Sequence, residues 1–164
     1  MNSFHESMLE YRKQLGLGAI QIAYKGLMEY MLGLRTYLKD RHPDFAVPGS
    51  LYFGYMEMTY FSLVPPTLKE RNLKIAVVFL HEAFRFEAWL AGVNKQVQAQ
   101  TWQLIKDSGW NKYPLVPSIQ GEDAIFQYVL ADDPDFSNLD ALTGQIEQGA
   151  LKFIADIEEF LSGR

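Results

Sequence analysis

The sequence predicts a single α+β domain, residues 1–164, in which N-terminal and C-terminal helices cover a small antiparallel sheet of about three strands in a meander. Three observations support this prediction. Both ends of the chain carry apolar residues every three or four positions, which is typical of amphipathic helices. The middle of the chain instead carries short apolar runs between turn residues, as strands do. No repeat or linker divides the chain, whose length fits one domain.

The N-terminal region is predicted to form two helices. Ser3 and Glu6 have the spacing of a capping box, so the first helix should run over Phe4–Leu15. Gly16–Gly18 supplies the flexible backbone of a turn, and the second helix follows over Ala19–Lys39. Its apolar stripe consists of Ile20, Tyr24, Leu27, Met31, Leu34 and Leu38.

Three strands are predicted in the middle of the chain. The first, Leu51–Phe61, is rich in aromatic residues, and two prolines follow it. The second, Leu73–His81, has apolar residues at both alternate sets of positions, which suits a central strand. Its hairpin partner is Arg85–Leu90. Because alternate residues of a strand point to the same side, Arg85, Glu87 and Trp89 should share one face.

The C-terminal half is predicted to be helical. Helices are expected over Val93–Lys106 and Gln120–Leu130, and Ser137 should cap a last helix that runs to Leu161. Gly144 and Gly149 are expected to weaken this last helix by about 1 kcal/mol each relative to alanine, and to permit a bend. The helices should pack over the sheet, because a small antiparallel sheet needs cover on its apolar faces.

Composition disfavours several classes of function. The chain has no cysteine, which excludes disulfides and thiol chemistry. It carries 15 basic and 20 acidic side chains, whereas a nucleic-acid-binding protein usually shows a basic surplus. Nothing resembles a signal peptide, and no apolar run approaches the ~20 residues of a membrane span. We therefore expect a cytoplasmic protein without a membrane or nucleic-acid partner.

No metal site or cofactor is predicted. His81-Glu82-Ala83-Phe84-Arg85 differs from the zinc motif His-Glu-x-x-His at its last position, and it lies in a predicted strand and turn rather than a helix. The other histidines, His5 and His42, lie far from it in the sequence. No glycine-rich phosphate loop or nucleophile motif is present.

Two acidic residues lie within apolar surroundings. Glu87 follows Phe86 in an otherwise apolar strand, and Glu57 lies among aromatic and methionine residues. A carboxylate on a covered face needs a charged or hydrogen-bonding partner, so these residues belong either to a structural polar network or to a pocket beside the sheet. In a pocket, the carboxylates would anchor a ligand or act as acid and base, Arg85 or Lys95 would bind an anion, and Trp89 would form a stacking wall. The candidate binding residues are Glu57, His81, Arg85, Glu87, Trp89, Lys95 and Trp110.

Four segments together resemble an uncharacterised bacterial domain family of unknown function: residues 23–31, 52–61, 84–92 and 108–113. The resemblance spans nearly the whole chain. It implies a stand-alone small bacterial protein, and it brings no assigned activity.

Two functions are consistent with these patterns. The first is a binding or interaction protein that self-associates as a homo-oligomer, which rests on the 3 Trp, 9 Tyr and 11 Phe residues and on the absence of a catalytic motif. The alternative is a small-molecule-binding protein or enzyme whose pocket lies beside the sheet and uses Glu57, Glu87, Arg85 and aromatic walls.

Overall fold

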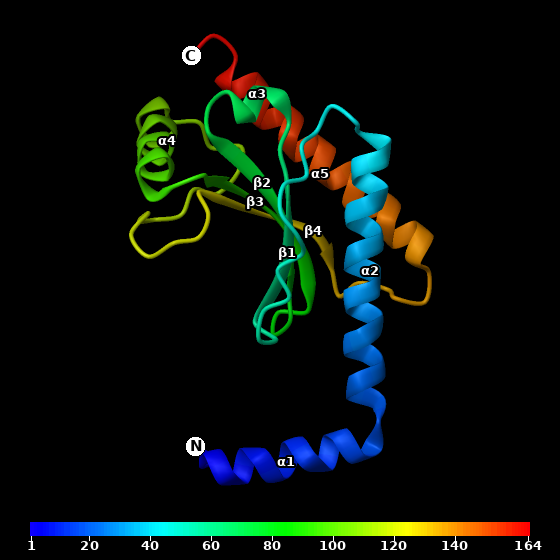
Figure 1. Cartoon of the computed structure of the whole chain (residues 1–164). Coiled ribbons are helices and arrows are strands. Elements are labelled where there is room, and N and C mark those ends of the chain that lie inside the picture. Colours follow the sequence, from blue (N-terminus) through cyan, green and yellow to red (C-terminus); the bar gives the residue numbers. More distant parts are fainter. The chain divides into compact units, whose positions relative to one another are not determined.

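The computed structural model describes all residues from 1 to 164 (Figure 1). It contains five helices and one antiparallel sheet of four strands, so the predicted fold class is confirmed. The chain divides into two compact units, residues 1–34 and 35–164. The elements are α1 (Phe4–Leu17), α2 (Ala19–Arg41), β1 (Met58–Leu63), α3 (Pro66–Lys69), β2 (Leu73–Leu80), β3 (Arg85–Gly92), α4 (Lys95–Ser108), β4 (Phe126–Asp132) and α5 (Leu139–Leu161).

The first unit holds α1 and most of α2. The predicted capping box is present: the Glu6 amide donates to Ser3 Oγ at 3.2 Å, and the Ser3 amide donates to Glu6 Oε2 at 2.6 Å. Gly18 ends α1 in the left-handed conformation with φ of 82°, and α2 begins at the next residue. No residue of α1 is buried.

The second unit is built around the sheet, whose strands follow one another in the order β1-β2-β3-β4. Phe61 of β1 pairs with Val77 of β2, which pairs with Ala88 of β3, and all three side chains are fully buried. Figure 1 shows α5 crossing one side of this sheet. The Tyr128 ring of β4 stacks on Phe153 of α5, with 5.6 Å between ring centres. This face of the sheet and α5 therefore share the main core.

Within the second unit, Glu147 of α5 binds residues at the end of α2 and directly after it. Its Oε2 accepts hydrogen bonds from Arg41 Nε at 3.1 Å and pairs with His42 Nε2 at 3.1 Å, while the Tyr37 hydroxyl lies 3.4 Å from Oε1. Glu147 is 9% exposed, so its charge needs these partners. Leu38, which belongs to the predicted stripe of α2, is also buried.

Aromatic residues account for much of the packing. One cluster lies around the β2–β3 hairpin, and a second lies between α5, β4 and the loop after α4. The first contains Phe79, Phe84, Phe86 and Phe136, and the second contains Trp110, Tyr113, Phe126, Tyr128, Phe153 and Phe160.

The predicted helix over Gln120–Leu130 is wrong, because this part of the chain contains strand β4. Phe126 and Tyr128 pair with Leu90 and Ala88 of β3, and a register shift opposite Phe86 and Glu87 accommodates one extra residue. The strand adds a fourth member to the predicted three-stranded meander. The helical interpretation fails because the pairing to β3 outweighs local helix propensity.

The first strand is shorter than the predicted Leu51–Phe61 and begins only at Met58. Gly54 and Met56 have positive φ angles of 75° and 67°, which an extended strand does not allow. At Gly54 a Cβ atom would lie 2.1 Å from the carbonyl oxygen of Met58, so only glycine fits this tight loop.

The ends of the remaining elements shift by a few residues from their predicted positions. The helix α4 begins at Lys95 rather than at the predicted Val93. Asn94 caps it, with Asn94 Oδ1 accepting from the Val97 amide at 2.8 Å. Asn138 rather than Ser137 caps α5. The helix α5 is continuous over 23 residues and includes both Gly144 and Gly149.

The outer edges of the sheet are partly occupied by neighbouring chain. Along β1, Tyr52 and Tyr60 exchange backbone hydrogen bonds of 2.8 and 3.0 Å, and Ala46 and Val64 do the same at 2.8 and 2.7 Å. Along β4, Leu115 bridges Phe126. No helix of the structure is both long and apolar enough to cross a membrane.

Candidate functional site

A groove of about 230 Å³ lies on the side of the sheet that carries Trp89, Ala76 and Tyr60. We call it the sheet-face groove. Its apolar lining comes from Met58, Tyr60, Ala76, Trp89 and Ala91, and its polar lining includes Lys74, Asn94, Lys95, Gln98 and Asp123.

Side-chain size explains why the groove exists. Ala76 of β2 pairs directly with Trp89 of β3, and Lys74 pairs with Ala91. Each pair places a small residue beside a large one, so the sheet surface is hollowed where the two alanines lie. Ala76 and Trp89 also belong to a buried apolar cluster with Val78 and Ala124.

Trp89 is held by the buried Glu87 carboxylate. The indole Nε1 donates to Glu87 Oε1 at 2.9 Å, and Arg85 Nε donates to Glu87 Oε2 at 2.6 Å. Glu87 is 2% exposed, and the three residues share one face of β3, as strand alternation predicts. Because Glu87 is buried and each of its oxygens accepts a hydrogen bond from a neighbour on β3, we infer that it positions the indole.

The start of α4 forms the other end of the groove. Gln98, which is 3% exposed, accepts from the Gly92 amide at 3.1 Å and donates to the Glu122 carbonyl oxygen at 2.9 Å. Lys95 Nζ donates to the same Glu122 oxygen at 2.9 Å. A Cβ atom on Gly92 would lie 2.5 Å from the Gln98 amide nitrogen, so glycine permits this close approach of α4 to β3.

Lys74 is the cation of the groove that has no partner. Its side chain is partly buried and forms no hydrogen bond or ion pair. Lys95, by contrast, uses one of its three donors on Glu122. The groove therefore offers one free ammonium group, and a second ammonium group that is already positioned, beside a fixed indole.

Glu57 lies in a separate hydrogen-bonded loop before β1. Its Oε1 accepts from the Tyr52 hydroxyl at 3.3 Å, and its Oε2 accepts from the Tyr55 amide. Desolvation acts to raise the pKa of Glu57, but hydrogen bonds from the Glu57 and Tyr55 amides and from Tyr52 outweigh it and lower the pKa. Glu57 and Glu87 share no hydrogen-bond partner, so the structure does not combine them in one carboxylate pair.

His81 contacts the start of β1 through Thr59, next to the same loop. Thr59 is fully buried, its hydroxyl donates to the Phe53 carbonyl oxygen at 2.7 Å, and it lies 2.9 Å from His81 Nε2. Because the single hydroxyl proton is used on Phe53, we infer that Nε2 carries a proton and donates to Thr59. Burial lowers the pKa of His81, although the Glu57 carboxylate acts to raise it.

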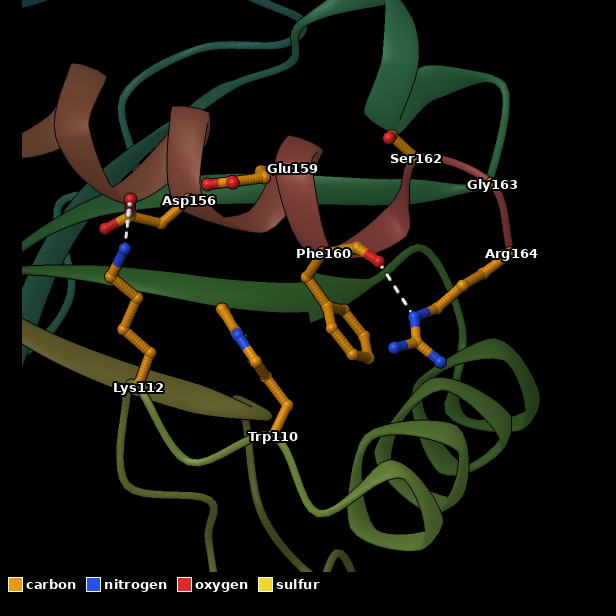
Figure 2. Close-up of a pocket in the computed structure, with 8 residues that line it drawn as sticks. All are labelled: Trp110, Lys112, Asp156, Glu159, Phe160, Ser162, Gly163 and Arg164. Carbon is orange, nitrogen blue, oxygen red and sulfur yellow. Dashed lines mark hydrogen bonds and ion pairs between the residues drawn. The ribbon is translucent and has the colours of Figure 1, made fainter.

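Trp110 lines a different pocket, of about 510 Å³, at the C-terminal end of α5 (Figure 2). Its ring stacks on Phe160 with 4.6 Å between centres and 20° between planes, and the Arg164 guanidinium lies 4.4 Å from the Phe160 ring centre. Figure 2 shows the Phe160 ring between the Trp110 and Arg164 side chains. The rest of the lining is Lys112, Asp156, Glu159, Ser162 and Gly163.

Two of the four charged residues that line this second pocket, Lys112 and Asp156, pair with each other. Asp156 accepts from the Tyr113 hydroxyl at 2.5 Å, from Lys112 at 2.9 Å and from Lys152 at 3.0 Å. These hydrogen bonds, led by that of Tyr113, lower the pKa of Asp156 strongly, while burial and the Asp156 hydrogen bond raise the pKa of Tyr113. Asp156 thus fastens the loop after α4 to α5.

Comparison with known proteins gives one match. A family model described as a domain of unknown function, DUF7000, matches residues 4–161. This chain belongs to that family. The predicted resemblance to a family of unknown function over nearly the whole chain is therefore confirmed. No curated protein and no solved structure matches the chain. The function of this DUF7000 protein must be argued from its own residues.

The structure distributes the predicted site residues of the DUF7000 chain over three places. Trp89 and Lys95 line the sheet-face groove, with Glu87 and Arg85 holding Trp89 in place. The other three lie elsewhere: Glu57 and His81 in the loop before β1 and at the end of β2, and Trp110 in the second pocket.

Sequence reasoning missed Lys74, Tyr60 and Gln98 as groove residues. Lys74 interrupts an apolar strand, and that interruption is a signal that the sequence does provide. Tyr60 and Gln98 join the groove only through strand register and the close approach of α4, which the sequence alone does not give.

Proposed function

We propose that this protein binds a small organic carboxylate with a flat apolar part in the sheet-face groove. The observation that supports this proposal most directly is the unpaired ammonium group of the partly buried residue Lys74, in a groove walled by Trp89. An ammonium group without a protein partner, beside a flat apolar wall, favours an anionic ligand with which it can form a charge-assisted hydrogen bond.

The walls specify the rest of the ligand. Trp89 is fixed by Glu87, so its ring needs little further ordering when a flat group packs against it. The groove volume of about 230 Å³ is below the roughly 300–1,000 Å³ of pockets for drug-sized ligands, so the ligand should be a small metabolite. Asp123 at the rim favours a ligand that also carries a hydrogen-bond donor.

The groove favours binding over catalysis. Glu87, the buried carboxylate next to it, is 2% exposed and does not line the groove. A general base must lie within hydrogen-bond reach of the substrate proton, which a carboxylate outside the lining does not. Binding without chemical conversion is therefore the function that this geometry supports best.

A thermal-shift screen with aromatic and aliphatic carboxylates, followed by calorimetric titration of each hit, tests the proposal. Lys74→Met keeps the length of the side chain but removes its charge, and we expect it to weaken binding about tenfold or more, or about 1.4 kcal/mol. Lys74→Arg should retain much of the affinity. Lys25→Met, which removes an exposed lysine from α2, is the matched control and should bind as the unmodified protein does.

A second variant tests the location of the site by shape rather than charge. Ala91→Leu adds side-chain volume inside the groove and should abolish binding while Lys74 is intact. The proposal is wrong if no carboxylate raises the melting temperature, or if Lys74→Met and Ala91→Leu both bind a confirmed ligand as tightly as the unmodified protein.

A further inference from the structure

The helix α1 carries an apolar stripe that nothing in its own unit covers. Phe4, Met8, Tyr11 and Leu15 follow one another at steps of four, three and four, which places them on one face. No α1 residue is buried, and Phe4 is 83% exposed and Tyr11 52% exposed. An isolated helix of 14 residues is only marginally stable in water, so this stripe needs a partner.

The junction after α1 prevents it from packing along α2 of the same chain. Gly18 alone separates the two helices, whereas two antiparallel helices need a connection of about 2–5 residues. The Gln21 side chain also donates to the Leu15 carbonyl oxygen at 2.7 Å, which fixes the start of α2 against the end of α1. The apolar stripe therefore does not pack along the length of α2.

We propose that two copies of this chain associate through α1, with the stripe of one copy packed antiparallel against the same stripe of the other. The spacing of four, three and four is the same when read in either direction, so an antiparallel pair is in register with itself. Phe4 then faces Leu15 of the second copy, and Met8 faces Tyr11 of the second copy. Each layer combines one aromatic and one aliphatic side chain, and the two-fold arrangement closes with two copies.

The residues around the stripe fit a second copy better than an anionic membrane. The positions beside it are His5, Ser7, Arg12 and Gln14, which carry one permanent charge and therefore cause little repulsion between copies. Across α1, Glu6 and Glu10 balance Arg12 and Lys13, whereas helices that bind anionic lipid are rich in basic residues.

The size of the stripe sets the expected strength of association. Its four side chains expose on the order of 400 Å², which is about half of the ~800 Å² that each partner contributes to a standard interface. We therefore expect a reversible dimer with a dissociation constant in the micromolar range.

Sedimentation velocity of the full chain from about 5 to about 500 μM covers this range of affinities and tests the proposal. The unmodified chain should change from monomer to dimer across the range. Met8→Glu places a charge in the stripe and should raise the dissociation constant at least tenfold. Leu9→Glu is the matched control, because Leu9 is as exposed as Met8, at 45% against 43%, but lies off the stripe; it should dimerise as the unmodified chain does.

Cross-linking tests the orientation, since the chain has no cysteine of its own. A mixture of Phe4→Cys and Leu15→Cys chains should form a disulfide-linked heterodimer, and Phe4→Cys alone should not link to itself. The inference is overturned if the unmodified chain is monomeric throughout, if Met8→Glu and Leu9→Glu act equally, or if Phe4→Cys chains link to each other. Its outcome is independent of ligand binding in the sheet-face groove.

Discussion

The Trp89 indole nitrogen donates a hydrogen bond of 2.9 Å to Oε1 of Glu87, which lies two residues earlier on the same strand. Residues at this spacing lie on one face of a strand, about 7 Å apart along the chain, and the long side chain of Trp89 spans that separation. The arrangement places a carboxylate that is 2% exposed directly behind the wall of the groove. The orientation of the groove wall therefore depends on a buried charge.

Arg85→Leu should destabilise the fold by about 2–4 kcal/mol, because it leaves the buried Glu87 charge with the indole as its one remaining partner. The double variant Arg85→Leu with Glu87→Leu should lose less stability than Arg85→Leu alone, since the unpaired charge is removed with its partner. Urea unfolding of the unmodified protein, of the single variants Arg85→Leu and Glu87→Leu, and of the double variant measures both effects. A loss below about 0.5 kcal/mol for Arg85→Leu would show that water solvates Glu87.

Stability should fall on mild acidification because of His81. Its folded-state pKa lies below the value of about 6.5 that it has when unfolded. The unfolded state then binds more protons, so the His81 contribution to stability is fully present above about pH 6.5 and is lost as the pH falls through the lower folded pKa. His81→Gln keeps a donor for Thr59 Oγ1 and should remove this loss.

The His81 prediction is checked by urea unfolding at several pH values between about 7.5 and 5, a range that brackets the ordinary histidine pKa. His5→Gln is the control, because His5 is exposed in α1 and should leave the pH dependence unchanged. Identical pH profiles for His81→Gln and the unmodified protein would contradict the prediction.

Asp156 should contribute a second loss of stability, at lower pH. Its folded-state pKa is depressed chiefly by the Tyr113 hydrogen bond, so its contribution is present above the unfolded value of about 3.9 and is lost as the pH falls toward the folded pKa. Asp156→Asn should cost about 1–2 kcal/mol at neutral pH and flatten the acid limb of the stability curve below about pH 4. Asp44→Asn, in an exposed loop, is the control and should leave that limb unchanged.

The two glycines of α5 should respond differently to alanine. At Gly144 a Cβ atom would meet nothing within 4 Å, so Gly144→Ala should stabilise the protein by about 0.5–1 kcal/mol. At Gly149 the same atom would lie 2.8 Å from Cδ2 of Leu130, and the gain in helix propensity should be offset as Leu130 shifts. Thermal unfolding of both variants compares them directly, and a larger gain for Gly149→Ala would show that Leu130 moves without cost.

Local patterns predicted the parts of the fold that depend on local chemistry. The Ser3–Glu6 capping box and the shared face of Arg85, Glu87 and Trp89 both follow from residue spacing. The predicted stripe of α2 is buried in its second half, at Met31, Leu34 and Leu38, whereas Ile20 at its start is 41% exposed. Strand β4 replaces the predicted helix over Gln120–Leu130, because the pairing of Phe126 and Tyr128 with β3 is a contact between distant parts of the chain that residue spacing does not show. The place of Lys74 in the groove also depends on a contact between strands, because only the pairing of β2 with β3 puts it beside Ala91.

The two edge strands of the sheet limit how a partner protein can bind to it. Residues 46 and 52 already bond to the outer backbone of β1, and β4 combines a register shift with two consecutive acidic residues, Asp132 and Asp133, at its end. Such features discourage a foreign strand from adding to a sheet, and with it fibril-like growth. Recognition by this protein should therefore proceed through side chains rather than through main-chain extension of the sheet.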